Sequence, residues 1–173
     1  DITLPGYSAF STADAARAVE RVLALGPARA KLGEGVGGTG QARIARPGDL
    51  AALDDGMDEA SLAQLGMVVE LNLEEEATFS VGVTRVHGMS ISYCGVQHST
   101  CNHAGESVYG GSKLLVVRGG FAELLREGLS SDMAEAVDKA RRFDAIVDEE
   151  VPEFFASRRN YDVILGRDAD DAR

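Results

Sequence analysis

A glycine-rich segment follows shortly after Lys31, with five glycines among the eight residues 33–40. Because glycine has no side chain, such a loop lets backbone N–H groups approach a ligand closely, most often a phosphate. A lysine at the base of the loop supplies the point charge that a phosphate needs. The segment therefore predicts a phosphate-binding loop, whose candidate ligand-binding residues are Lys31, Gly35, Gly37, Gly38 and Gly40.

The residues around the loop distinguish between the known kinds of glycine-rich loop. A G-x-G-x-x-G dinucleotide loop opens a helix, but only six residues separate Gly40 from the Pro47-Gly48 turn. No Lys-Ser or Lys-Thr closes the run as in a P-loop, and the H-R-D and D-F-G signatures of kinases are absent. The remaining arrangement is a hairpin of strands 29–31 and 42–46. Its loop is either a flap over a nucleotide or a flexible turn without a ligand.

Carboxylates at two apolar strands are the next candidates for chemistry. Glu70 lies in the apolar segment Met67–Leu71, where a buried carboxylate is costly without a partner, so it either faces solvent or contacts a ligand. Asp162 lies in the apolar segment 160–165, and further acids follow it. Mg²⁺ prefers one or two carboxylates together with phosphate oxygens, so Asp162 is a candidate metal ligand. The alternative is an exposed position on an edge strand.

Two cysteines and two histidines are close together, at Cys94, His98, Cys101 and His103. Zinc binds Cys2His2 sets, but this tight order fits no familiar zinc motif. We interpret the cluster as a coincidence, with Cys94 at a position where a small apolar residue suits the core. Zinc binding at this cluster is the less favoured alternative.

The whole chain has the composition of a globular protein, with 173 residues, 45% apolar and 26% charged residues. A net charge of −11 without a basic stripe argues against a nucleic-acid partner, and no apolar run reaches the length of a membrane span. The few cysteines indicate a reducing compartment such as the cytoplasm. Because the chain begins at Asp1 without Met, we expect that upstream sequence has been removed.

Helices and strands alternate along the chain and predict an α+β fold with mainly antiparallel strands. A helix capped by Thr12 is expected over residues 12–25, and a long helix over 132–157 that is interrupted near Pro152. A hairpin is predicted over 75–94, followed by a long loop over 97–112. The core face of the first helix is expected to consist of Ala13, Ala16, Val19, Val22 and Leu23.

Taken in order, these motifs resemble the ATP-grasp superfamily. Lys31 and the glycines resemble its lysine strand and glycine flap, and Met-Val-Val-Glu70-Leu-Asn-Leu its hinge between subdomains. Glu76-Ala-Thr-Phe-Ser-Val resembles its E-x-[ST]-V-x-V strand, and Asn-Tyr-Asp162-Val-Ile-Leu the strand with the first Mg²⁺ carboxylate. More narrowly, Tyr-Gly-Gly-Ser112 and Ala-Ser-Arg-Arg-Asn-Tyr-Asp162 are similar to an uncharacterised proteobacterial family described as biotin-carboxylase-like.

The resemblance implies two α+β subdomains, a lid over residues 1–70 and a larger part over 71–173, with ATP and Mg²⁺ as ligands. It implies that Glu70, Leu71 and Leu73 bind adenine and that Glu76 contacts the ribose. Asp162 would hold Mg²⁺, while Arg158 or Arg159, and less securely Arg118, would stabilise the transferring phosphoryl group.

The implied reaction is ligation of a small-molecule carboxylate to an amine or similar nucleophile through an acyl phosphate. The family's second Mg²⁺ ligand and its N-terminal subdomain have no counterpart here, so we expect a catalytically inactive portion of a longer enzyme. The alternative is a non-catalytic nucleotide-binding or regulatory module with the same fold.

Overall fold

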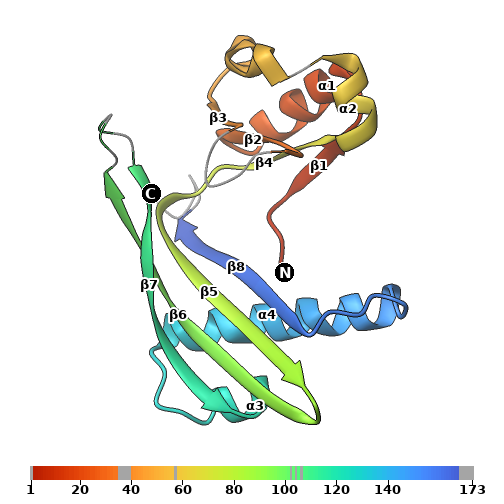
Figure 1. Cartoon of the computed structure of the whole chain (residues 1–173). Helices are drawn as coiled ribbons and strands as arrows, with labels where there is room; N and C mark the ends of the chain where they lie inside the picture. Colours follow the sequence, from red (N-terminus) through yellow and green to blue (C-terminus); the bar gives the residue numbers. More distant parts are fainter. Residues whose placement is uncertain are drawn as a thin grey trace. The chain divides into compact units, whose positions relative to one another are not determined.

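The computed structural model of the chain describes residues 2–34, 40–56, 58–101, 103, 105 and 107–167 (Figure 1). These residues form two compact units, one made mainly of Thr3–Glu74 and the other of Glu75–Gly166. Each unit has its own sheet and its own buried apolar cluster. No helix in the described part of the chain is long and apolar enough to cross a membrane.

The first unit is built on a four-stranded sheet in the order β1-β4-β2-β3, with every pair antiparallel. The strands are β1 (Gly6–Ala9), β2 (Ala28–Leu32), β3 (Gln41–Ile44) and β4 (Met67–Leu71). The helices are α1 (Thr12–Leu23), the 3-10 helix η1 (Pro47–Gly56) and α2 (Glu59–Leu65). The predicted hairpin around the glycine-rich segment is confirmed as β2 and β3.

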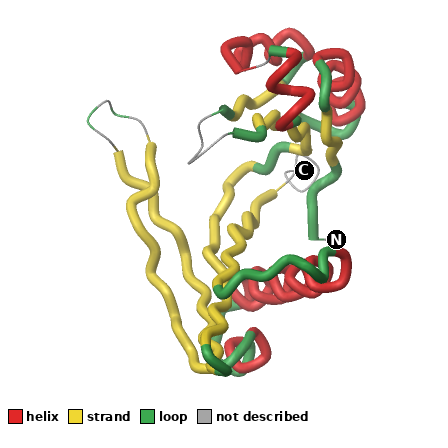
Figure 2. Tube along the Cα trace, turned by 45° about the vertical axis from the view of Figure 1, so that its right-hand side comes forward, coloured by secondary structure: helices red, strands yellow, loops and turns green. Residues whose placement is uncertain are grey.

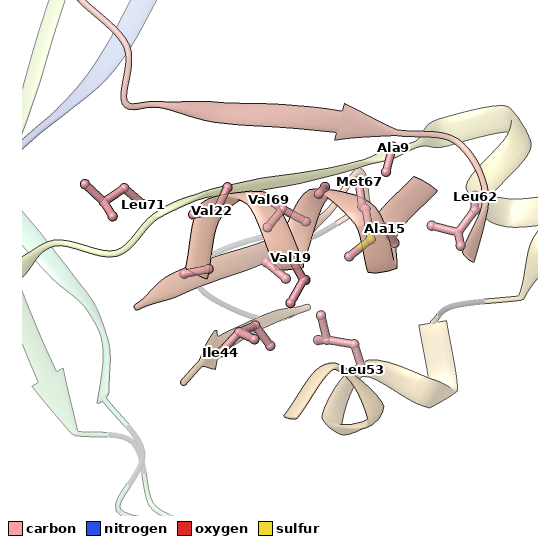
Figure 3. Packing of buried hydrophobic residues seen from close by; sticks show 13 residues of the cluster. Ala9, Ala15, Val19, Val22, Ile44, Leu53, Leu62, Met67, Val69 and Leu71 are labelled. Carbon is pink, nitrogen blue, oxygen red and sulfur yellow. The ribbon is translucent and has the colours of Figure 1, made fainter. Parts of the chain in front are cut away.

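Helix α1 packs its apolar stripe against this sheet (Figure 3). The buried stripe is Ala15, Ala18, Val19 and Val22, which follow the i, i+3, i+4, i+7 spacing of one helix face. The prediction of Ala13 and Ala16 in the core was wrong, and both are exposed. Alanines occur on both sides of this helix, so only Val19 and Val22 identified the buried face.

The N-terminal cap of α1 also differs from the prediction. Ser11 is the cap, and its Oγ accepts a hydrogen bond from the Asp14 N–H at 3.1 Å. Thr12, which the sequence suggested, is the first helical residue, and its hydroxyl instead donates to Glu59 Oε1 at the start of α2.

The second unit is built on a sheet in the order β7-β6-β5-β8, shown by its long strands in Figure 2. The strands are β5 (Glu74–Val86), β6 (Met89–Cys101), β7 (Ser107–Arg118) and β8 (Arg158–Arg167). The β5–β6 hairpin turns at His87 and Gly88, whose φ angles are 52° and 77°. Both residues of a tight hairpin turn need positive φ, which glycine adopts without strain.

The predicted loop over residues 97–112 was wrong, because most of it is strand. β6 continues to Cys101 and β7 begins at Ser107, with a register shift between His98 and Ser99. Polar residues and glycines dominate this part of the hairpin, and its residues are largely exposed. None of the residues described in this segment is buried, so the sequence shows no apolar alternation there.

Helices α3 (Phe121–Leu124) and α4 (Ser131–Glu150) cover one face of the second sheet, with Leu124, Ala136, Val137 and Ala140 in the buried cluster. α4 is capped by Ser130 at its start and ends at Glu150, two residues before Pro152, so it is shorter than the predicted helix. Together the two units confirm the predicted α+β class with mainly antiparallel strands.

Candidate functional site

Lys31 and Glu70 form an ion pair on the face of the first sheet that α1 does not cover. Their neighbours Ala30 and Val69 are fully buried against α1, and side chains alternate along a strand, so Lys31 and Glu70 lie on the other face. Lys31 Nζ lies 2.5 Å from Glu70 Oε1, and the side chains are only 28% and 21% exposed. A cation and a carboxylate are thus held together beside the base of the glycine-rich loop.

The base of that loop is closed by backbone hydrogen bonds. Leu32 N–H donates to the Gly40 carbonyl at 2.9 Å, and Gly33 N–H donates to the Gly66 carbonyl at 3.1 Å. Gly40 has a φ of 68°, a conformation that side-chain-bearing residues rarely adopt. These bonds place both ends of the loop directly after Lys31. Three predicted binding residues, Gly35, Gly37 and Gly38, lie outside the described residues.

The segment after Glu70 is hydrogen-bonded to other parts of the chain. Leu71 N–H donates to the Pro5 carbonyl at 2.9 Å, and the Leu73 carbonyl accepts from Asn72 Nδ2 at 3.0 Å. Asn72 is only 3% exposed, and its Oδ1 accepts from Arg29 Nε at 3.1 Å. Leu71 N–H is therefore used within the chain, and the Leu73 carbonyl already accepts one hydrogen bond.

Asp162 lies on the face of the second sheet opposite α4. Tyr161, Val163 and Leu165 pack against the buried cluster, while Asp162 and its alternate neighbours along β8 are exposed. Its Oδ1 accepts hydrogen bonds from Gln97 Nε2 at 2.8 Å, Asn160 Nδ2 at 3.1 Å and Ser80 Oγ at 3.4 Å. Among the described residues, no hydrogen bond goes to its second oxygen, Oδ2.

Arg158 lies on the same face as Asp162, at the start of β8. Its Nε donates to the Tyr93 hydroxyl at 3.3 Å, and its guanidinium carbon lies 5.9 Å from the centre of the Tyr93 ring. The Tyr93 hydroxyl in turn donates to Asn160 Oδ1 at 2.9 Å. A row of polar contacts therefore connects Arg158 with Asp162 along the sheet.

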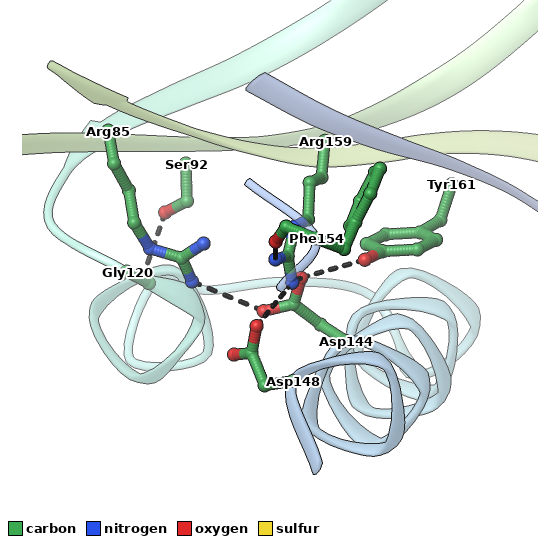
Figure 4. Close-up of polar contacts among 8 residues, drawn as sticks. All are labelled: Arg85, Ser92, Gly120, Asp144, Asp148, Phe154, Arg159 and Tyr161. Carbon is green, nitrogen blue, oxygen red and sulfur yellow. Dashed lines mark hydrogen bonds and ion pairs between the residues drawn. The ribbon is translucent and has the colours of Figure 1, made fainter. Parts of the chain in front are cut away.

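Arg159 lies on the opposite face, against α4 (Figure 4). Its Nη1 lies 3.1 Å from Asp144 Oδ1 and 2.6 Å from Asp148 Oδ1, and its side chain is only 9% exposed. Its Nη2 donates to the Phe154 carbonyl at 3.1 Å. Arg159 therefore binds α4 and the Phe154 carbonyl, on the face of the sheet opposite Asp162. This position argues against the catalytic role that the sequence suggested for it.

Asp144 is the centre of this buried network. Besides Arg159, its carboxylate accepts from the Tyr161 hydroxyl at 2.7 Å and from Arg85 Nη2 at 3.2 Å. Burial acts to raise the pKa of Asp144, but the hydrogen bonds from Tyr161, Arg85 and Arg159 outweigh it and hold the pKa below its ordinary value. Burial, and then Asp144 as acceptor, raise the pKa of Tyr161 to about 12. The network is therefore an ionised carboxylate bound by cations and a neutral phenol.

Cys94, His98, Cys101 and His103 do not form a metal site within the described part of the chain. Cys94 is fully buried and Cys101 is exposed, so the two thiols occupy different environments. Burial raises the pKa of Cys94 to about 11. No group of three or more His, Cys, Asp or Glu side chains that could hold a metal occurs among the described residues.

The sequence singled out some candidate residues of each unit and missed others. Lys31 is next to Glu70, and Arg158 shares a face with Asp162, whereas the side chain of Glu76 lies outside the described residues. Sequence reasoning missed Ser80, Tyr93, Gln97 and Asn160 as neighbours of Asp162. These polar residues lie at alternate positions of their strands, which the sequence shows. To place them beside Asp162, however, one must know which strands are adjacent.

Comparisons with known proteins identify the family of the chain and a known structure with a similar fold. The model of a family described as "Protein of unknown function (DUF3182)" matches residues 1–173. No curated protein sequence matches the chain. The ADP complex of purK, N5-carboxyaminoimidazole ribonucleotide synthetase, is similar with a TM-score of 0.51 and 15% identity over 97% of this chain. The Aspergillus clavatus carboxyaminoimidazole ribonucleotide synthase complexed with ATP gives a TM-score of 0.49, with 16% identity over 98% of this chain and 38% of that one.

The similarity to purK shows an ATP-grasp-like fold. This chain spans 37% of the length of the purK chain that it matches. At 15% identity the comparison establishes the fold and leaves the chemistry to be argued from this chain's own residues.

Proposed function

The chain belongs to the DUF3182 family, and from its geometry we propose that it is the nucleotide-binding portion of an ATP-grasp enzyme. The observation that carries this proposal is the position of Lys31, paired with Glu70 beside the closed base of the glycine-rich loop. A lysine on a strand at the base of a glycine-rich loop is suited to bind the phosphates of a nucleotide.

Each part of the nucleotide has a candidate partner. Lys31 and the loop glycines would bind the phosphates, and Glu70 the adenine. Because Leu71 N–H is bonded to Pro5, the Leu71 carbonyl and the Leu73 N–H are the backbone groups we assign to the adenine edge. Glu76 would contact the ribose. The ADP in the purK structure of similar fold supports the choice of an adenine nucleotide.

Asp162 fits a magnesium ion because its three hydrogen-bond donors all use Oδ1. The other oxygen is available to a cation, and Mg²⁺ is commonly held by one or two carboxylates plus phosphate oxygens. When bound, Mg²⁺ would neutralise phosphate charge. Arg158, exposed on the same face, would bind the negatively charged phosphoryl group, and this chain alone is not expected to complete the reaction.

We propose for the whole protein the ligation of a small-molecule carboxylate to an amine or similar nucleophile. The carboxylate would receive the phosphoryl group, and the resulting acyl phosphate would react with the nucleophile and release phosphate. The ion pairs of Arg159 with Asp144 and Asp148 argue against Arg159 and leave Arg158 as the candidate for catalysis. The alternative is a nucleotide-binding module without chemistry.

Calorimetry with ADP and Mg²⁺ tests the binding proposal. Lys31→Ala should weaken binding by about 1.5–3 kcal/mol, the range for hydrogen bonds to charged groups. Lys139→Ala is the matched control, because Lys139 also pairs with a glutamate, Glu135, at 3.2 Å on α4. Equal affinities of Lys31→Ala and the unmodified chain would remove Lys31 from the site.

A further inference from the structure

The side chain of Asp162 is held by an unusual concentration of donors on a single oxygen. Gln97 comes from β6, Ser80 from β5 and Asn160 from β8, and all three donate to Oδ1. Gln97 Nε2 also donates to Ser80 Oγ at 2.8 Å, so these two donors fix each other. Three adjacent strands thus determine the orientation of one exposed carboxylate.

The orientation of the Asn160 amide is fixed in turn by Tyr93. The Tyr93 hydroxyl donates to Asn160 Oδ1, which leaves the Nδ2 of the amide to face Asp162. Tyr93 is only 8% exposed, and its ring reaches across β5 because the residue opposite it is Gly82. A Cβ at Gly82 would overlap with the Tyr93 hydroxyl. Arg158 Nε completes the row by donating to the same hydroxyl.

Hydrogen bonds to one oxygen of a carboxylate direct the other oxygen towards a metal and set the way in which it binds. Ca²⁺ accepts carboxylates through one or both oxygens in flexible geometry, whereas Mg²⁺ demands near-ideal octahedral geometry at short distances. A carboxylate whose Oδ1 is saturated by donors is therefore restricted to binding through Oδ2 alone.

We infer that Ser80, Gln97 and Asn160 are positioning residues that make Asp162 a one-oxygen ligand and thereby favour Mg²⁺ over Ca²⁺. This inference rests on the proposed metal-binding role of Asp162. Gln97 is the principal donor, because its bond to Oδ1 is the shortest of the three and it also holds Ser80.

Paramagnetic line broadening by Mn²⁺ alone tests the inference without nucleotide or activity. In the ¹⁵N-labelled chain, Mn²⁺ should broaden the amide signals around Asp162, Ser80 and Gln97, and Mg²⁺ should reverse this at lower concentration than Ca²⁺. Gln97→Leu should weaken Mn²⁺ binding about tenfold, the lower end of the effect of removing a partner that orients a metal ligand. Gln97→Leu should also reduce the preference for Mg²⁺ over Ca²⁺ in displacing Mn²⁺.

Ser80→Ala is the second variant, and it should have a smaller effect because the Ser80 bond is the longest, at 3.4 Å. Thr84→Val on β5 is the matched control, since no hydrogen bond joins it to Asp162 within the described structure. The same amide spectra show whether each variant is folded.

An unchanged Mn²⁺ midpoint in Gln97→Leu, or equal losses of Mg²⁺ and Ca²⁺ affinity, would overturn the inference while leaving Asp162 as the ligand. Absence of broadening near Asp162 in the unmodified chain would overturn the metal site together with the inference. Neither result would alter the separate calorimetric test of Lys31.

Discussion

Lys31 Nζ and Glu70 Oε1 are 2.5 Å apart on adjacent antiparallel strands, so the cation proposed to bind phosphate is already paired with the carboxylate proposed to bind adenine. A nucleotide that contacts both side chains would therefore break this ion pair. Lys31 would then contribute to phosphate binding and Glu70 to adenine binding, so the two contributions to affinity can be measured separately.

Glu70→Gln should weaken the binding of ADP but preserve or strengthen that of inorganic pyrophosphate, because it frees Lys31 from its partner. One net hydrogen bond contributes about 1 kcal/mol, so the ratio of ADP to pyrophosphate affinity should fall about fivefold. Calorimetry with each ligand measures this ratio. Glu135→Gln, which removes the partner of Lys139, should leave it unchanged. A parallel loss of both affinities in Glu70→Gln would argue against separate roles.

Asp144→Ala should destabilise the chain strongly, because the cation of Arg159 would lose its buried partner. Removing one member of a buried ion pair costs about 3–5 kcal/mol, and we expect the low end because Asp148 also contacts Arg159. Asp148 is 56% exposed, so Asp148→Ala should cost about 1 kcal/mol or less. Urea unfolding measures both free energies, and equal costs would contradict a structural centre at Asp144.

Asp144 should also make stability depend on pH in the acid range. Its pKa is lowered in the folded chain, so its contribution is fully present above the unfolded pKa of about 3.9 and is lost as pH falls through the folded pKa. Asp144→Asn cannot ionise and should show a flatter decline of unfolding free energy below about pH 4. Urea unfolding at several pH values measures this dependence. The same pH dependence of the unfolding free energy in Asp144→Asn and in the unmodified chain would contradict the prediction.

The two thiols should react at very different rates. The pKa of Cys94 is raised to about 11 by burial and its side chain is inaccessible, while Cys101 is exposed. With iodoacetamide near pH 8, mass spectrometry should find Cys101 alkylated and Cys94 unmodified until urea is added. In Cys101→Ser, the folded chain should remain nearly unlabelled. Rapid labelling of Cys94 in that folded variant would contradict its burial.

The elements that the sequence predicted well are those with one buried face. β4 shows a continuous apolar run, and β5 alternates clearly because Phe79, Val81 and Val83 face α4. In the part of β6 and β7 beyond His98, none of the described residues is buried, so this part was predicted as a loop. Strand pairing there relies on backbone hydrogen bonds, which leave no apolar pattern in the sequence.

The candidate site shows the same limit at the level of single residues. Arg158 and Arg159 are adjacent and of the same type, and only the direction of β8 relative to α4 separates an exposed arginine from one bound to Asp144. Likewise Gln97 contacts Asp162, although 65 residues separate them in the chain. Such contacts depend on strand order, which the pattern of one sequence does not specify.

The central claim is that an adenine nucleotide binds to the first unit, beside Lys31 and the base of the glycine-rich loop. A titration of the ¹⁵N-labelled chain with Mg²⁺ and ADP, followed through backbone amide signals, tests it most directly. We predict that the signals of Lys31, Gly40 and Leu73 shift with one common midpoint. Shifts confined to residues away from Lys31 and Leu73 would contradict the account.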